Sequence, residues 1–160
     1  MRSEETLNRW TLAGLVAGGI VVLDQLTKRW AQETLPGNPI VVWEGWLAFV
    51  YAENTGSAFG FFPGAGAVIA VIGVFAVALL LWMLREAGRN REVVGLGLVG
   101  GGAIGNLVDR VTRGDGLVDG AVVDFIKVPL IPNFNVADAA LTVGVGLLLV
   151  VTWLSSRHAE

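Results

Sequence analysis

The chain has 160 residues, of which 54% are hydrophobic and 16% charged, and its mean hydropathy of +0.65 sets it apart from ordinary soluble domains. A net charge of -3 without a basic stripe gives no electrostatic footprint for nucleic acid, which we do not expect as a partner. The lack of cysteine excludes disulfides, thiolate metal sites and a catalytic thiol. The apolar residues gather in long runs, and a run of about 20 residues is what a bilayer requires. We therefore predict a single membrane-embedded domain over residues 1–160.

Four apolar segments are predicted to cross the membrane as helices. They cover approximately residues 10–30, 65–84, 93–108 and 137–154. Four of the six tryptophans stand at the ends of these segments, where an amphipathic ring favours the headgroup level. The first segment is longer than the apolar region of a signal peptide and has no convincing cleavage site, so we interpret it as a retained span.

The distribution of positive charge predicts the direction of the spans. The link from Arg85 to Glu92 holds three arginines, and the two tails hold more, whereas residues 31–64 contain no Lys or Arg. Positive residues favour the cytoplasmic side, so both termini are predicted there and links 31–64 and 109–136 outside. Link 31–64 mixes aromatic and β-branched residues with Gly and Pro, which predicts short strands rather than a helix.

Polar residues cluster where the outer ends of these helices are predicted. Asp24 and Lys28 are one helical turn apart and share a face. The other members are Asn54, Asn106, Asp109, Arg110, Asp124, Asn135 and Asp138. An ionisable side chain near the centre of a bilayer costs about 2.5 to 3.5 kcal/mol on insertion scales, so such residues normally face a cavity or a partner. We interpret the cluster as a functional site rather than as separate anchors and helix caps.

The third apolar segment is rich in glycine. Gly97, Gly101 and Gly105 are spaced four residues apart, so they lie on one face of a helix. Small residues at this spacing allow helices to approach closely in lipid. The pattern predicts tight helix packing beside the polar cluster.

The residue types of the cluster narrow the chemistry. The only histidine, His158, lies in a charged tail, so a Ser-His-Asp triad and a histidine metal site lack their central residue. A dyad of Ser57 and Lys28 stays open as an alternative. Two aspartates in a partly desolvated site cannot both ionise cheaply, so such a pair offers a base and an acid together. Asp124, in an apolar strand-like stretch, and Asp138, at a helix start, are the best placed pair.

Five sequence blocks stand in order along nearly the whole chain. They read DQLTK at 24–28, NTGSAFG at 54–60, GGAIGNLVDR at 101–110, VVDFI at 122–126 and FNVAD at 134–138. Together they resemble the motif blocks of the lipoprotein signal peptidase family, also called signal peptidase II. The resemblance implies an all-α membrane protein, a bundle of four transmembrane helices with a small β-rich extracytoplasmic cradle.

The resemblance also implies an activity and a site. It implies an aspartic endopeptidase of the bacterial cytoplasmic (inner) membrane that cleaves diacylglyceryl-modified prolipoproteins on the amino side of the lipidated cysteine. The catalytic pair is then Asp124 and Asp138, near the outer leaflet, and no cofactor or metal is implied. The residues implied to bind substrate or support the site are Asp24, Lys28, Asn54, Asn106, Asp109, Arg110 and Asn135. Prolipoprotein and membrane lipids are the expected partners, and the oligomeric state stays open.

Several details and two rival functions stay open at this level. Residues 112–121 make a longer link than the family pattern leads us to expect, and Asp119 within it is interpreted as part of a solvated turn. We expect Asp24 and Asp109 to neutralise Lys28 and Arg110. An ion- or proton-coupled transporter is the leading rival, because charged residues within membranes also mark ion paths. A non-enzymatic assembly subunit is the second rival.

Overall fold

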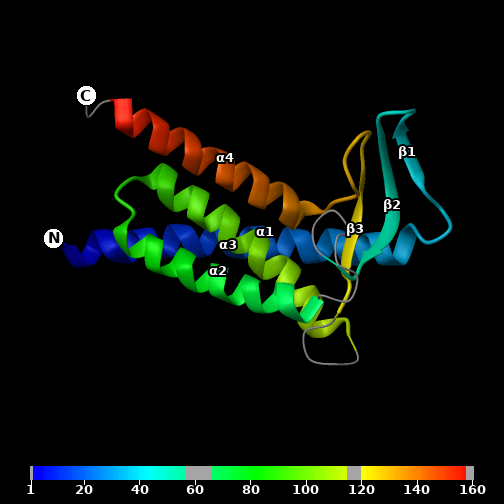
Figure 1. The fold of residues 1–160 in the computed structure, drawn as a ribbon, viewed down its shortest axis with the longest axis horizontal. Coiled ribbons are helices and arrows are strands. Elements are labelled where there is room, and N and C mark those ends of the chain that lie inside the picture. The colour runs from blue at the N-terminus through cyan, green and yellow to red at the C-terminus, as the bar shows by residue number, and fades with distance from the viewer. Residues whose placement is uncertain (1, 57–65, 115–119, 158–160) are drawn as a thin grey trace.

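The structure, a computed structural model, describes residues 2–56, 66–114 and 120–157. Within these ranges the helices are α1 (Arg2–Thr34), α2 (Gly66–Glu86), α3 (Asn90–Thr112) and α4 (Val136–Arg157). The strands are β1 (Ile40–Trp43), β2 (Leu47–Asn54) and β3 (Val122–Lys127). The helices run side by side with the strands gathered at one end, and the α2–α3 turn lies at the opposite end (Figure 1). The four predicted helices are present, and α1 and α3 each continue four residues past the predicted end of their apolar segment.

Three helices in the described part of the chain are long and apolar enough to cross a membrane: Asn8–Thr34 within α1, then α3 and α4. The helix α2 is not among these three. Large apolar side chains project outward from the bundle, with Leu15, Phe75 and Leu149 each at least 66% exposed. Outward apolar side chains on long helices are typical of a surface that faces lipid.

The helix α3 is the centre of the bundle, because its glycines let neighbouring backbones approach. A Cβ atom on Gly101 would lie 2.8 Å from the backbone oxygen of Ala17 in α1. A Cβ atom on Gly102 would lie 2.4 Å from the backbone oxygen of Ala137 in α4. The predicted packing role of Gly97, Gly101 and Gly105 is confirmed, and Gly102 adds a second face directed at α4.

The three strands form an antiparallel sheet in the order β1-β2-β3, which confirms the predicted β-rich segment. The end of α1 packs against this sheet through a core that includes Ala31, Leu35, Val123 and Phe125. The Trp30 ring meets the Phe125 ring edge-on, with centroids 6.1 Å apart. The sheet is therefore seated on the end of the bundle where the polar cluster lies.

Strand β3 places two segments beside the cluster. Asp124 pairs with Ala52 of β2, so the end of β2 at Asn54 lies next to it. Backbone hydrogen bonds between Phe134 and Ile126 run both ways, at 3.0 and 2.8 Å. They hold the chain that enters α4 against β3, and Asn135 follows directly.

Candidate active site

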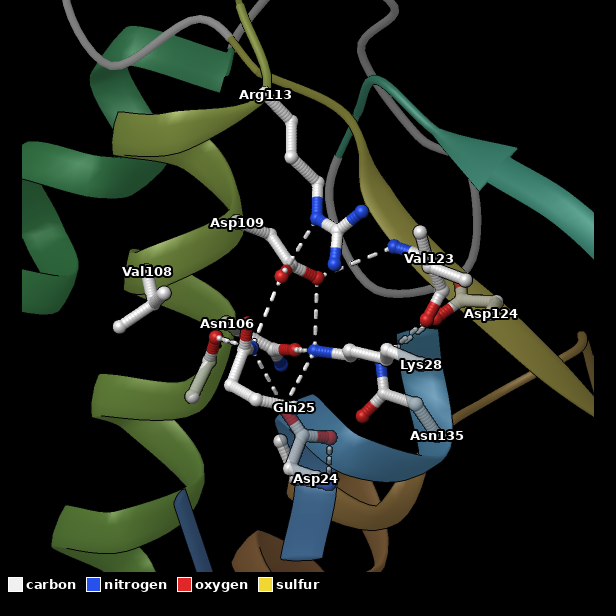
Figure 2. Close-up of polar contacts among 12 residues, drawn as sticks. Asp24, Gln25, Lys28, Asn106, Val108, Asp109, Arg113, Val123, Asp124 and Asn135 are labelled. Carbon is white, nitrogen blue, oxygen red and sulfur yellow. Dashed lines mark hydrogen bonds and ion pairs between the residues drawn. The ribbon is translucent and has the colours of Figure 1, made fainter. Parts of the chain in front are cut away.

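The polar residues predicted from the sequence converge where the bundle meets the sheet. Figure 2 shows Asp24, Lys28, Asn106, Asp109, Asp124 and Asn135 among them. They are contributed by α1, α3 and α4, by strands β2 and β3, and by the residue before α4. Buried among them are Asp24, Lys28, Asp109, Arg110, Asp124 and Asn135. Burial of this many polar groups requires that each finds partners, and no buried side-chain nitrogen or oxygen in the described residues lacks one.

Lys28 is the centre of a buried ionic cluster. Its ammonium nitrogen lies 2.7 Å from Asp24 Oδ2 and 2.9 Å from Asp109 Oδ2, and all three side chains are fully buried. Arg113 Nε contacts the other oxygen of Asp109 at 2.9 Å. Gln25 Nε2 donates to Asp24 at 3.2 Å and to Asp109 at 3.0 Å. The expected pairing of Lys28 with Asp24 is present, and the two carboxylates share two cations.

The two carboxylates of this cluster also hold backbone groups. Asp24 Oδ1 accepts the backbone N–H of Ala137 at 2.9 Å, at the first turn of α4. Asp109 Oδ2 accepts the backbone N–H of Val123 at 3.2 Å, in β3. Charge-assisted bonds of this kind are stronger than neutral ones. The ionic cluster therefore fixes the two elements that carry Asp124 and Asp138.

Arg110 does not pair with Asp109, its expected partner. Its guanidinium donates to the backbone oxygen of Gly56 at 2.5 Å and to that of Gly120 at 3.3 Å, and forms no ion pair with Asp109. Neighbouring residues of a helix point in different directions, so Asp109 turns to Lys28 while Arg110 turns to the loops. The expected Asp109–Arg110 pair is wrong, and Arg110 instead holds two chain segments together.

Two asparagines present their amide groups to Asp124. Asn54 Oδ1 accepts the backbone N–H of Gly56 at 3.0 Å, and its Nδ2 donates to Asp124 Oδ2 at 3.1 Å. Asn135 Oδ1 accepts the backbone N–H of Asp138 at 2.9 Å, and its Nδ2 donates to Asp124 Oδ1 at 2.8 Å. A backbone N–H can only donate, so it fixes which end of each amide faces Asp124. Each Asp124 oxygen thus receives one neutral donor.

Asp138 is held in a similar way. Asn106 Nδ2 donates to its Oδ1 at 2.9 Å, and the backbone N–H of Asn135 donates to its Oδ2 at 3.3 Å. The contacts between Asn135 and Asp138 run in both directions and close the first turn of α4 as a capping box. Among the described residues, neither Asp124 nor Asp138 forms an ion pair. Neutral donors position both carboxyl groups without forcing either to ionise.

The environment of Asp124 favours a retained proton. Burial is the main cause that raises its pKa to about 6, and the nearby Asp138 charge raises it further. The hydrogen bonds from Asn54 and Asn135 and the positive charge of Lys28 act in the opposite direction. A carboxyl group with a pKa near neutrality, beside a second carboxyl group, is suited to proton transfer.

A cavity of about 530 Å³ adjoins the two aspartates. Its polar lining includes Asn54, Asp124 and Asp138, together with Asn133 and Thr142, and the other lining residues, such as Phe134 and Leu141, are apolar. A mainly apolar pocket with few convergent polar groups is typical of a site that binds an apolar ligand and reacts with one part of it. Within the described residues no group of three His, Cys, Asp or Glu side chains is arranged to hold a metal ion.

The alternative of a Ser57 and Lys28 dyad would need the Lys28 side chain, which has other partners in the structure. Lys28 Nζ contacts three acceptors, namely Asp24, Asp109 and Asn106 Oδ1 at 2.9 Å, so its ammonium is fully engaged. Ser57, together with Asp119 and His158, lies outside the described residues. Arg113 and Gln25 are members of the cluster that sequence reasoning missed, although Arg113 follows Asp109 by one helical turn.

Comparisons with known proteins identify the family. The family model described as Signal peptidase (SPase) II matches residues 16–154. The lipoprotein signal peptidase of Syntrophomonas wolfei is 34% identical to this chain, over 88% of this chain and 92% of its own length. The lipoprotein signal peptidase of Mycobacterium avium is 38% identical, over 86% of this chain and 76% of its own length. A bacterial membrane enzyme solved by the in meso method at 2.3 Å has a TM-score of 0.82 at 28% identity, over 92% of this chain and 91% of its own. The chain therefore belongs to the signal peptidase II family, the lipoprotein signal peptidases.

Proposed function

We propose that this protein is an aspartic endopeptidase that removes signal peptides from diacylglyceryl-modified prolipoproteins, on the amino side of the lipidated cysteine. Family membership supports the substrate class. The observation that carries the aspartic mechanism is that Asp124 and Asp138 share one cavity and are held by neutral donors, while the pKa of Asp124 is raised to about 6.

The chemistry follows from one shared proton. The ionised carboxylate of the pair takes a proton from a water molecule, whose oxygen attacks the scissile carbonyl carbon. The protonated carboxyl group donates its proton to the carbonyl oxygen, which gives a neutral tetrahedral diol. When the diol collapses, the C–N bond breaks and the amine leaves with a proton from the protonated carboxyl group. The other carboxylate takes a hydroxyl proton of the diol, which restores the one shared proton of the pair. Because Asp124 and Asp138 titrate together, the two steps are assigned to the pair and not to one residue each.

The apolar part of the cavity suits an acylated, apolar substrate. Phe134 and Leu141 line it, and so does Val143, which is 60% exposed on the outside of α4. The cavity therefore extends from the carboxyl groups to the helix face that lipid would cover. A signal peptide in the membrane has access to the pair from that face without leaving the apolar phase.

The proposed function includes a membrane arrangement. We place four spans, with α2 as the fourth, in a bacterial inner membrane, and keep both termini in the cytoplasm. Arg85, Arg89 and Arg91 lie at the α2–α3 turn, at the end of the bundle opposite the sheet (Figure 1). Their charge favours the cytoplasmic side, so residues 31–64 and 109–136 and the aspartate pair lie at the outer leaflet. Residues 1–160 then form one catalytic domain.

The transporter alternative is less well supported by the same residues. Charged side chains on an ion path are needed at several depths in the membrane. The buried charged residues in the described part of the chain are Asp24, Lys28, Asp109, Arg110 and Asp124. All of them lie at the sheet end of the bundle, which favours a site at one surface over a route through the membrane.

Cleavage of a purified, lipidated prolipoprotein tests the function. Asp124→Asn and Asp138→Asn remove the titrating group and keep its size, so each is expected to lower kcat by about 10²- to 10⁴-fold. The double variant is expected to lose little more, because the pair acts as a unit. Glu86→Gln, which changes an exposed carboxylate at the far end of α2, is the matched control and is expected to cleave normally. Near-normal cleavage by either single aspartate variant would remove the aspartic mechanism.

A further inference from the structure

The contacts of Lys28 extend beyond the two aspartates that neutralise it. Its third acceptor is Asn106 Oδ1, at 2.9 Å (Figure 2). Charge neutralisation does not require this contact, because Asp24 and Asp109 already provide two carboxylates. The extra bond links the ionic cluster to the residue that holds Asp138.

The orientation of the Asn106 amide depends on this bond. An ammonium group can only donate hydrogen bonds, so only the oxygen end of the amide can bind to it. Asn135 Nδ2 donates to the same oxygen at 3.2 Å. Asn106 Nδ2 is thereby directed to Asp138 Oδ1 at 2.9 Å. In the opposite orientation, the amide NH₂ would face an ammonium and the amide oxygen would face a carboxyl group.

We propose that Lys28 is a positioning residue for the catalytic pair and acts through Asn106. The ammonium fixes the Asn106 amide, and the amide NH₂ holds the Asp138 carboxyl group in the orientation that faces the cavity shared with Asp124. Lys28 itself contacts neither catalytic carboxyl group through any hydrogen bond or ion pair among the described residues. This role rests on the proposed aspartic peptidase function. It explains the hydrogen bond from Lys28 to Asn106, which the neutralisation of two aspartates does not explain.

A double-mutant cycle separates the two roles. Lys28→Met and Asn106→Ala are each expected to lower kcat on a lipidated prolipoprotein by about 10- to 100-fold, the range for one hydrogen bond to a charged group. Neither residue lines the cavity, so KM is expected to change by less than about threefold. In the Asn106→Ala background, Lys28→Met is expected to add less than about threefold, because its route to Asp138 is already lost. Each kcat is read at the top of the variant's pH profile, since the Lys28 charge also lowers the pKa of Asp124.

Arg113→Met provides the matched control for the cycle. Arg113 contacts the same Asp109 as Lys28 but has no hydrogen bond to Asn106. Its effect on kcat is expected to multiply with that of Asn106→Ala. If Lys28→Met also multiplies fully with Asn106→Ala, Lys28 acts only through charge or folding and the positioning role is overturned.

Loss of Lys28 can prevent folding, so two further variants keep the test decisive. The cycle is repeated with Lys28→Met and Asp24→Asn made together, which removes one buried charge of each sign and keeps the oxygen that accepts the Ala137 N–H. Asn106→Asp keeps two oxygens for Lys28 but loses the donor to Asp138. It is expected to retain the fold and to lose at least about 10-fold in kcat. Wild-type kcat in folded Asn106→Asp overturns the proposal.

The outcomes also separate this role from the proposed function. If the wild type cleaves the lipidated substrate and Asp124→Asn does not, the function stands whatever the cycle shows. An additive cycle then overturns the positioning role alone. If the purified wild type fails to cleave, the aspartic peptidase function fails and the role of Lys28 fails with it.

Discussion

At the scale of single residues, the buried carboxyl group of Asp124 links stability to pH. Its pKa is raised to about 6, so between about pH 4 and pH 6 the folded protein holds a proton that the unfolded chain has lost. The folded state binds more protons in this window, and stability therefore falls as pH rises through it. A pKa difference of about 2 units corresponds to about 3 kcal/mol.

Asp124→Asn tests this linkage, because an amide does not titrate. Its melting temperature is expected to fall less than that of the wild type between pH 4.5 and pH 7.5. The variant keeps an acceptor for one of the two asparagine donors and loses the other contact, which costs about 1 kcal/mol at every pH. Thermal unfolding of the detergent-solubilised protein across this range gives the comparison. Parallel curves for the two proteins would mean that Asp124 stays ionised.

Lys28 and Arg113 both contact Asp109 and differ in burial. The Lys28 side chain is fully buried, whereas that of Arg113 is 20% exposed. Lys28→Ala leaves two buried carboxylates with one cation, and its expected cost is about 3 to 5 kcal/mol of unfolding free energy. Arg113→Ala is expected to cost about 1 kcal/mol, because water reaches the site and Lys28 remains. Equal melting temperatures of the two variants would contradict the central place of Lys28 in the cluster.

At the scale of secondary-structure elements, glycines set the distance between α3 and α4. A Cβ atom on Gly102 would lie 2.4 Å from the backbone oxygen of Ala137, and a backbone atom cannot swing aside. Gly102→Ala is therefore expected to cost about 1 to 3 kcal/mol of stability. It is also expected to lower kcat, because Ala137 precedes Asp138 and the two helices must separate.

Gly100→Ala is the control on the same helix. Nothing lies within 4 Å of a Cβ atom at Gly100, and alanine in a helix is more favourable than glycine by about 0.5 to 1 kcal/mol. Its melting temperature is expected to equal or exceed that of the wild type. Circular dichroism melts give the melting temperatures of the two variants. A Gly102→Ala protein as stable as Gly100→Ala would contradict the close approach of α3 to α4.

At the scale of the whole molecule, the proposed direction in the membrane is testable with single cysteines, because the chain has none of its own. Asn90 begins α3 at one end of the bundle, and the turn between β1 and β2 lies at the other. Glu44→Cys is preferred to a change at Gly45, whose φ of 75° disfavours a side chain. An impermeant thiol reagent added outside is expected to label Glu44→Cys and not Asn90→Cys. Labelling of both from outside contradicts the arrangement.

The sequence by itself determined those features that depend on local spacing. Apolar runs predicted the helices, and glycines four residues apart predicted close packing on α3. The i, i+4 separation of Asp24 and Lys28 predicted their ion pair, which is present at 2.7 Å. Ordered motif blocks predicted the family, which the comparisons confirm. All of these features follow from the fixed geometry of a helix or from the order of residues along the chain. Both can be read from the sequence without knowledge of the fold.

Only the tertiary structure decided the partners that come from distant parts of the chain. Arg110 turns from its neighbour Asp109 to Gly56 and Gly120, and Gln25 and Arg113 join the cluster through Asp109. The orientation of each asparagine amide is set by a donor that the fold brings to its oxygen. The raised pKa of Asp124 depends on burial and on a second carboxyl group from another element. These properties vary with distance and solvent exclusion, which are defined only once the helices and the sheet have packed.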